Sequence, residues 1–252
     1  MSSMVRATSL FLLVLTACGA TPAQCQTGPG ADGAEWDQAR AGLIAGQRGS
    51  MAQAVDRWKM LSASNGQFGF SEYAGFILAY PGFPEEPKLR GWAEAALARE
   101  AASPAQLIAF FDKVAPATNP ARAQYALALA AMGRPEAARV ALDAWRGGPM
   151  SQTAEATIFS TYAATITQAD HDERMDALLW AGAADAVQRQ VLYVSAERRG
   201  DFLARSAMLT GNSPEAMGFA VTPASMSDLG YVYNRARQMR LSGNSYGAAA
   251  IV

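Results

Sequence analysis

The sequence contains a single histidine, His171, and most acid–base or metal chemistry would have to use it. A nucleophilic triad would need a serine and a carboxylate brought to that ring. A zinc site would need further ligands, and no second histidine is present. On a helix, His171 would share a face with Met175 and Leu178, which lie four and seven residues further on. We therefore expect His171 to pack against its own apolar stripe.

Acidic residues crowd the same stretch of sequence. Asp170 and Glu173 lie close to His171, and Asp172 and Asp176 would lie on one helical face because they are four residues apart. Such a face could hold a cation weakly. Alternatively, the cluster complements a helix dipole, which favours negative charge in the first turn. We expect the second arrangement, with no metal site and no cofactor.

Two motifs match known site patterns by letter alone. Gly28, Gly30 and Gly33 fit the dinucleotide-binding G-x-G-x-x-G pattern, and residues 243–247 (GNSYG) fit the G-x-S-x-G pattern of a nucleophile elbow. The first pattern needs a preceding strand and a following helix. The second needs a strand-to-helix turn, with its acid and histidine later in the chain. Neither context is predicted, so no catalytic residue is assigned to this chain.

An export signal lies at the N-terminus. Arg6 supplies a positive charge, and residues 10–15 (LFLLVL) form an apolar stretch too short to span a bilayer. The sequence Leu-Thr-Ala-Cys that follows resembles a bacterial lipobox, in which the cysteine, here Cys18, is acylated and becomes the first residue of the mature protein. The alternative is an ordinary signal that is cleaved near Ala20 or Ala23.

These features predict three parts of the chain. A lipoprotein-type signal peptide covers 1–17, a flexible tether covers 18–33, and a helical domain covers 34–252. The protein would then lie in the periplasm of a bacterial envelope, anchored to the outer membrane by lipid. Cys25 would be left without a partner, so no internal disulfide is expected.

The composition favours packed helices and argues against nucleic-acid binding. Of the 252 residues, 50% are hydrophobic and only 17% are charged, and the formal net charge is -1. A nucleic-acid-binding domain usually shows a basic stripe. The densest basic patches here are small, and we expect them to be ordinary solvated faces; they are Arg198 with Arg199, and Arg235 with Arg237 and Arg240.

The sequence from residue 34 onward predicts an all-α fold. Its clearest unit is 68–97, where two helices with apolar faces are joined by a Pro/Gly corner. The first helix is apolar enough to be covered on more than one side. Capping residues and prolines mark further helix starts at Ser103, Asn119, Pro135, Ser151, Thr167, Ser213 and Thr222. We predict about thirteen short helices, with no sustained strand pattern.

A weak internal similarity suggests how these helices are arranged. Residues 131–138 recur loosely at 209–216 and again at 241–245. Each copy is a helix end, a glycine suited to a left-handed cap, and a new helix start. Helical hairpins repeated in this way stack into a solenoid. The sequence therefore predicts a right-handed α-superhelix that is similar to tetratricopeptide arrays without showing a clean repeat.

Four segments, in order along roughly 65–250, resemble the N-terminal superhelical domain of soluble lytic transglycosylases of the alphaproteobacterial type. Residues 70–97 resemble that family's aromatic-rich helix, YPG-x-P corner and following helix. Residues 146–151 (RGGPMS), 167–180 (TQADHDERMDALLW) and 234–237 (NRAR) resemble three later family segments. The sequence departs from the family pattern with glutamine at position 168 in place of proline and asparagine at 234 in place of aspartate.

The resemblance implies an activity for the whole protein. Such enzymes cleave the MurNAc–GlcNAc β-1,4 bond of peptidoglycan and leave a 1,6-anhydro-MurNAc end. They use one glutamate, followed by serine, in a lysozyme-like domain C-terminal to the superhelix. This chain contains no Glu-Ser pair. We therefore expect it to be an inactive scaffold that binds glycan strands, with the catalytic domain encoded beyond Val252.

The alternative is a free-standing helical-repeat protein of the envelope that binds a partner or acts as a scaffold. In either case, most tryptophan and tyrosine side chains should pack in the core. One or two of them on a concave surface could stack on sugar rings, but the sequence assigns no particular residue to glycan binding.

Overall fold

The computed structural model describes residues 33–47 and 49–251, and within them every regular element is a helix. The all-α prediction is confirmed for this part of the chain. The signal peptide, Cys18, Cys25, and Gly28 and Gly30 lie outside the described residues. The helices are α1 (Ala34–Ala45), α2 (Met51–Ala63), α3 (Phe70–Ala79), α4 (Glu86–Ala96), α5 (Pro104–Phe111), α6 (Asn119–Ala131), α7 (Ala137–Arg146), α8 (Gln152–Tyr162), α9 (Gln168–Ala181), α10 (Ala184–Gln190), α11 (Ala196–Leu209), α12 (Pro223–Ser227), α13 (Leu229–Leu241) and α14 (Ser245–Ala250).

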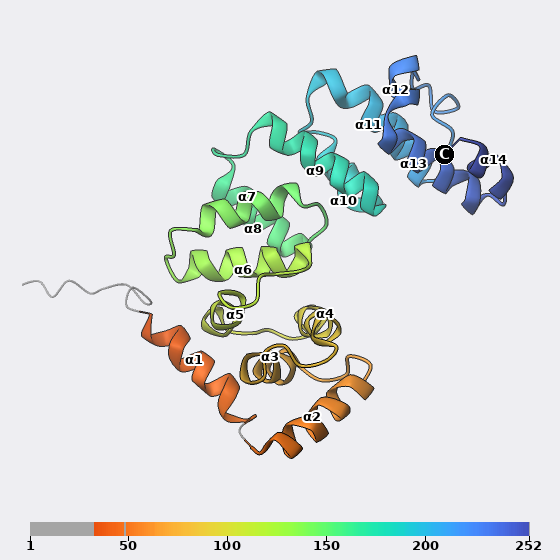
Figure 1. Cartoon of the computed structure of the whole chain (residues 1–252). Coiled ribbons are helices and arrows are strands. Elements are labelled where there is room, and N and C mark those ends of the chain that lie inside the picture. The colour runs from red at the N-terminus through yellow and green to blue at the C-terminus, as the bar shows by residue number, and fades with distance from the viewer. Residues whose placement is uncertain (1–32, 48, 252) are drawn as a thin grey trace, which may run out of the picture.

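The helices follow one another along an elongated molecule, with α1 and α2 at one end and α13 and α14 at the other (Figure 1). Each helix packs mainly on helices close to it in sequence: α3 on α1 and α4, α5 on α1 and α6, α6 on α7, and α9 on α7, α10 and α11. The buried apolar side chains accordingly form three clusters in chain order, spanning 61–166, 175–202 and 204–231.

The hairpin formed by α3 and α4 is the best predicted unit. The predicted apolar face of α3 is buried, and the helix is covered on two sides because α1 packs on one of them and α4 on another. The contact with α1 is very close at Gly75: a Cβ built there would lie 2.4 Å from the carbonyl oxygen of Leu43. A side chain at position 75 would therefore push α1 away from α3.

The strongest capping signals are confirmed. Ser103 with Gln106, and Thr167 with Asp170, form reciprocal capping boxes at the starts of α5 and α9. Each box provides acceptors for two backbone N–H groups at the start of the helix, where such groups have no intrahelical partner. Ser151 caps α8 by accepting a hydrogen bond from the Ala154 amide.

The helix predicted to start at Asn119 does begin there but has a different cap, and the start predicted at Pro135 is displaced. The cap of α6 is Thr118 and not Asn119, whose side-chain amide instead donates to the carbonyl oxygens of Ala144 and Pro149, at 2.9 and 3.1 Å. The helix expected at Pro135 begins at Ala137. In both cases the proline or asparagine lies within a residue or two of the true boundary.

The three similar segments in the sequence form the same corner. Gly133, Gly211 and Gly243 all have positive φ, at 66°, 83° and 86°. At each corner the amide of the next residue donates to a carbonyl oxygen five residues earlier: Arg134 to Leu129, Asn212 to Ala207 and Asn244 to Met239, at 2.8–3.0 Å. This bond closes the end of a helix as in a Schellman motif.

The helix predicted at Ser213 is wrong. Ser213 does cap a turn, because its hydroxyl accepts a hydrogen bond from the Ala216 amide, but the turn ends at Gly218, whose φ is 77°. Phe219 and Val221 then pack against the apolar cluster that contains Met208 and Tyr231. That packing holds the segment in a non-helical path. Conversely, α10 and α11 were not marked by the predicted start signals, although Ser195 caps α11.

Candidate functional site

His171 lies half-buried among aromatic rings near the start of α9. Its ring stacks on Tyr193, with centroids 5.3 Å apart and planes 18° apart, and meets Trp145 edge to face at 5.7 Å. Nε2 of Gln190 lies 3.1 Å from Nδ1 of His171 and donates to the His171 carbonyl oxygen. The sequence predicted that His171 packs against Met175 and Leu178 of its own helix, but its ring contacts come from Trp145 on α7, Phe159 on α8 and Tyr193 after α10.

The acidic residues around His171 hold neighbouring elements together. Asp170 accepts hydrogen bonds from Thr167 and from Nε of Arg146, the last at 2.5 Å. Asp172 accepts from the Ser195 amide at 2.8 Å, and Asp176 pairs with the buried Arg205. Within the described residues, no group of three or more histidine, cysteine or acidic side chains is placed to hold a metal ion.

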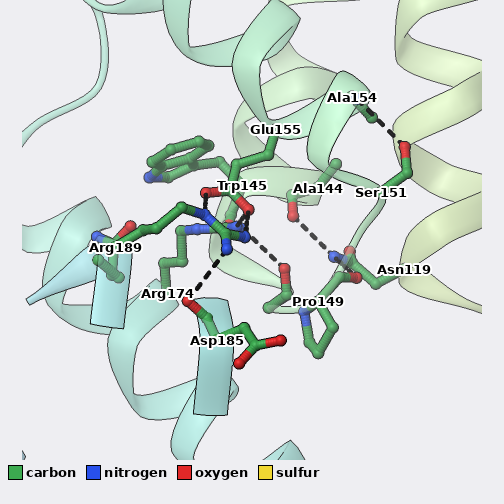
Figure 2. A network of polar contacts seen from close by, with 12 residues as sticks. Asn119, Ala144, Trp145, Pro149, Ser151, Ala154, Glu155, Arg174, Asp185 and Arg189 are labelled. Atoms are coloured by element: carbon green, nitrogen blue, oxygen red, sulfur yellow. Dashed lines mark hydrogen bonds and ion pairs between the residues drawn. The ribbon is translucent and has the colours of Figure 1, made fainter. Parts of the chain in front are cut away.

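A buried arginine on α9, Arg174, connects that helix to the corner between α7 and α8 (Figure 2). The side chain of Arg174 is fully buried, and its Nη1 donates to the carbonyl oxygens of Trp145 and Gly148, at 3.1 and 2.7 Å. Its Nη2 lies 3.1 Å from Oε2 of Glu155 on α8. Arg189 on α10 holds the same carboxylate through two hydrogen bonds of 3.0 and 2.8 Å. One carboxylate thus joins α8, α9 and α10.

The charges of this network are fixed near neutral pH. Burial alone would raise the pKa of Glu155, but hydrogen bonding from Arg189 and the positive charges of Arg174 and Arg189 outweigh burial and hold that pKa below 4.5. Burial lowers the pKa of Arg174 to about 10, although the charge of Glu155 opposes that change. Glu155 is therefore ionised at neutral pH and is a poor proton donor, whereas a general acid needs a pKa near the working pH.

An open hollow of about 490 Å³ lies beside this network. We call it the aromatic hollow; its lining includes Trp145, Gln152, Glu155, Phe159, Arg189, Gln190, Leu192 and Tyr193. The Trp145 indole is buried between the Arg174 guanidinium, 4.3 Å from the ring centroid, and the stacked Phe159 ring at 5.5 Å. Tyr193 and Leu192 are exposed at the rim. The volume of the aromatic hollow lies within the range of small-ligand pockets, roughly 300–1,000 Å³.

The surroundings of His171 make stability depend on pH. Burial lowers the pKa of His171 below 6.5, although the charges of Asp170 and Asp172 oppose this effect. Between the folded pKa and 6.5 the unfolded chain binds more protons, so stability is lost as the pH falls through that window. We expect the free energy of unfolding in urea to decrease between about pH 7 and pH 5.5, and His171→Gln to flatten the change. An identical slope in the variant would contradict this assignment.

A second hollow, of about 520 Å³, lies at the other end of the molecule between α13, α14 and the end of α9. Trp180 and Tyr233 pack together in it, with centroids 4.5 Å apart, and Arg237 and Arg240 are part of its lining. Its walls are mostly apolar side chains. Arg198, Arg199 and Arg240, from the basic patches of the sequence, are exposed, whereas Arg235 and Arg237 are half-buried.

Three of the four sequence segments that resemble lytic transglycosylases meet in the fold. Segment 146–151 joins segment 167–180 through the Arg146–Asp170 ion pair and the bond from Arg174 to the Gly148 carbonyl oxygen. Segment 234–237 joins the same helix: Nδ2 of Asn234 donates to the Leu179 carbonyl oxygen at 3.1 Å. These residues therefore fix the angles between helices, and the network around Arg174 gives them no free acid.

The G-x-S-x-G match at 243–247 lies between two helices. Asn244 caps α14 by accepting a hydrogen bond from the Gly247 amide, and Ser245 is the first residue of α14. The segment before the motif is α13. This is not the strand-to-helix turn that a nucleophile elbow requires.

The sequence did not single out most residues of the aromatic hollow. Trp145 falls under the general expectation that most tryptophans pack in the core, and no motif marks Glu155, Phe159 or Arg189. Glu155 and Arg189 are 34 residues apart, so no short spacing connects them. The adjacent Leu192 and Tyr193, directly after a short helix, were the one signal of an exposed apolar rim.

Comparisons with models of protein families, with curated proteins and with solved structures find no match to this chain. Neither a family nor an activity follows from relatives. Within the described residues, no helix is both long and apolar enough to cross a membrane.

Proposed function

We propose that this chain is the scaffold part of an exported peptidoglycan lytic transglycosylase. In this role its helical hairpins stack as a right-handed α-superhelix that holds glycan strands. A lysozyme-like domain outside these 252 residues cleaves the MurNAc–GlcNAc β-1,4 bond and leaves the 1,6-anhydro end. The observation that carries the proposal is the direct contact between the family-like segments 146–151, 167–180 and 234–237 through Arg146, Arg174 and Asn234.

The repeated corners support the stacked arrangement. The same backbone hydrogen bond, from an amide to the carbonyl oxygen five residues earlier, closes the helices that end before Gly133, Gly211 and Gly243. Each helix also packs mainly on its neighbours in sequence, as expected of a solenoid. A superhelix of this kind presents a long surface, which suits an extended polymer such as a glycan strand.

The state of the acidic groups supports a non-catalytic role. Hydrogen bonding from Arg134 lowers the pKa of Glu136. At Glu155 and at Asp170, burial alone would raise the pKa, but hydrogen bonds to the charged carboxylate outweigh burial and lower it. Glycoside cleavage needs a carboxyl group that keeps its proton near neutral pH. These three groups have the opposite property.

We expect the purified chain to sediment with insoluble peptidoglycan without releasing 1,6-anhydro fragments. Fragments are measured by chromatography of the soluble fraction, and activity by a zymogram. The same expression strain tests the anchor, since labelling by a fatty-acid probe should be lost in Cys18→Ala. Clearing of peptidoglycan by this chain alone would refute the scaffold role. Equal labelling of both forms would remove the lipid anchor.

The alternative, a free-standing envelope protein that binds a partner through helical repeats, is favoured by one observation. The aromatic hollow is built entirely from α7, α8, α10 and the segment after α10, so it needs no further domain. The DNA sequence past codon 252 separates the two proposals. A continuing frame with a Glu-Ser pair in a helix supports the transglycosylase, and a stop codon supports the free-standing protein.

A further inference from the structure

The second hollow, between the end of α9, α13 and α14, follows one face of α13, and we call it the α13 hollow. The residues of α13 that line it recur at helical spacing; they are Leu229, Val232, Tyr233, Ala236, Arg237 and Arg240. From the first to the last of these residues the helix rises about 16 Å. The hollow therefore follows about three turns of the helix, and its character changes along them.

The first half of α13 gives the hollow an apolar, exposed surface. Leu229 is 78% exposed, and Trp180, which packs against Tyr233 there, is 41% exposed. From α14 the hollow receives the small side chains of Ala248 and Ala249, which leave it unfilled on that side. A ligand with an apolar body would remove this surface from water.

The second half of α13 brings two arginines without partners to the same hollow. The side chains of Arg237 and Arg240 form no hydrogen bond and no ion pair with any described residue, and no acidic side chain of the described chain lines the hollow. Most other arginines in the described ranges hold an acceptor, as Arg189 holds Glu155. Two like charges three residues apart on a helix repel each other. An anionic group placed against both would relieve that repulsion.

The size and charge of the α13 hollow narrow the choice of occupant. A second copy of the chain would bring the same basic patch to the contact, because a two-fold dimer joins identical surfaces. A partner helix is about 10–12 Å across with its side chains and would fill roughly 1,500 Å³ over 16 Å, whereas the hollow holds about 520 Å³. That volume is typical of small-ligand pockets, and an alkyl chain is narrow enough to enter it.

We propose that the α13 hollow binds one alkyl-chain amphiphile with an anionic head, such as a long-chain carboxylate. The alkyl chain lies over Leu229 and Tyr233, between α13 and α14. The carboxylate accepts charge-assisted hydrogen bonds from the guanidinium groups of Arg237 and Arg240. This inference goes beyond the proposed function, because glycan binding does not require it, and its failure would leave the scaffold role unaffected.

Isothermal titration calorimetry of the full chain with sodium dodecanoate, kept below the concentration at which micelles form, tests the site. We expect saturable binding of one dodecanoate per chain. Decanoate is shorter by two CH₂ groups and should bind at least about tenfold more weakly, because each buried CH₂ changes the affinity about fourfold. Dodecyltrimethylammonium has the same chain length and a positive head, and it should also bind at least about tenfold more weakly than dodecanoate.

Three variants locate the binding. The double variant Arg237→Gln, Arg240→Gln should weaken dodecanoate binding at least about tenfold and reduce the difference between the two head groups. Ala249→Trp should also weaken binding, because Ala249 is exposed and lines the hollow, so that the indole fills the hollow without entering the core. The double variant Arg198→Gln, Arg199→Gln removes the same charge from an exposed pair on α11 and should leave binding unchanged. Circular dichroism checks that each variant is folded.

Several results would overturn the inference. They are no saturable binding of dodecanoate, equal binding of the two head groups, and unchanged binding in either the Arg237/Arg240 variant or Ala249→Trp. An equal loss in the Arg198/Arg199 variant would also overturn it, since binding would then follow net charge. If the chain sediments with phosphatidylglycerol vesicles and does not bind monomeric dodecanoate, this face docks on a membrane, and the inference of a ligand site is wrong.

Discussion

Replacement of Glu155 by glutamine should lower the free energy of unfolding by about 3 kcal/mol, because it leaves the buried Arg174 guanidinium without a counter-charge. Arg174 is fully buried, and the Glu155 side chain is only 14% exposed. For a chain of this length, the melting temperature should fall by about 6–12 °C. Urea denaturation followed by circular dichroism measures the free energy, and thermal denaturation measures the midpoint.

Glu72→Gln is the matched control for this substitution. Glu72 also pairs with an arginine, Arg57, but its side chain is 45% exposed. Exposed ion pairs contribute at most about 1 kcal/mol, so the control should change stability only slightly. Equal losses in the two variants would mean that Arg174 does not depend on the charge of Glu155.

Replacement of Gly75 by alanine should destabilise the protein by about 2 kcal/mol and loosen α1. The added Cβ would lie 2.4 Å from the carbonyl oxygen of Leu43. Backbone atoms cannot rotate away, so α1 must move, and overpacking of this kind costs about 1–3 kcal/mol. Hydrogen exchange should be faster throughout α1 and little changed in α9. Denaturation in urea gives the accompanying loss of stability.

Gly91→Ala provides the opposite control on a neighbouring helix. Gly91 also lies inside a helix, α4, but a Cβ there would meet no atom within 4 Å. Alanine has a higher helix propensity than glycine, so this variant should gain about 0.5 kcal/mol. If Gly75→Ala were also stabilising, the close approach of α1 to α3 would be wrong.

Much of the fold could be predicted because helix ends depend on nearby residues. Ser103 and Thr167 cap their helices through partners three residues away. Gly133 has the left-handed backbone that the residue after a helix end often adopts. The helix predicted at Ser213 does not form. Its local capping signal is real, but Gly218 and the packing of Phe219 stop the helix after one turn. Tertiary packing overrode the local preference.

The candidate site was far less predictable. The sequence directed attention to His171 and its acidic neighbours, and the structure gives those groups partners within the protein. The hollow depends on side chains from four segments, and its central ion pair joins Glu155 to Arg189. No periodicity relates such positions. They come together because α7 packs on both α8 and α9, and α9 packs on α10, so only a three-dimensional structure could identify the site.

The close packing of helices that are neighbours in sequence also bears on how the chain acquires its structure. Among the described residues, the side-chain hydrogen bond that spans the greatest length of sequence joins Arg40 to Ala109, 69 positions apart. Chains dominated by short-range contacts close few long loops and fold quickly. The N-terminal helices can therefore reach their native packing while later helices are still being synthesised, and the growing chain exposes little apolar surface at any moment.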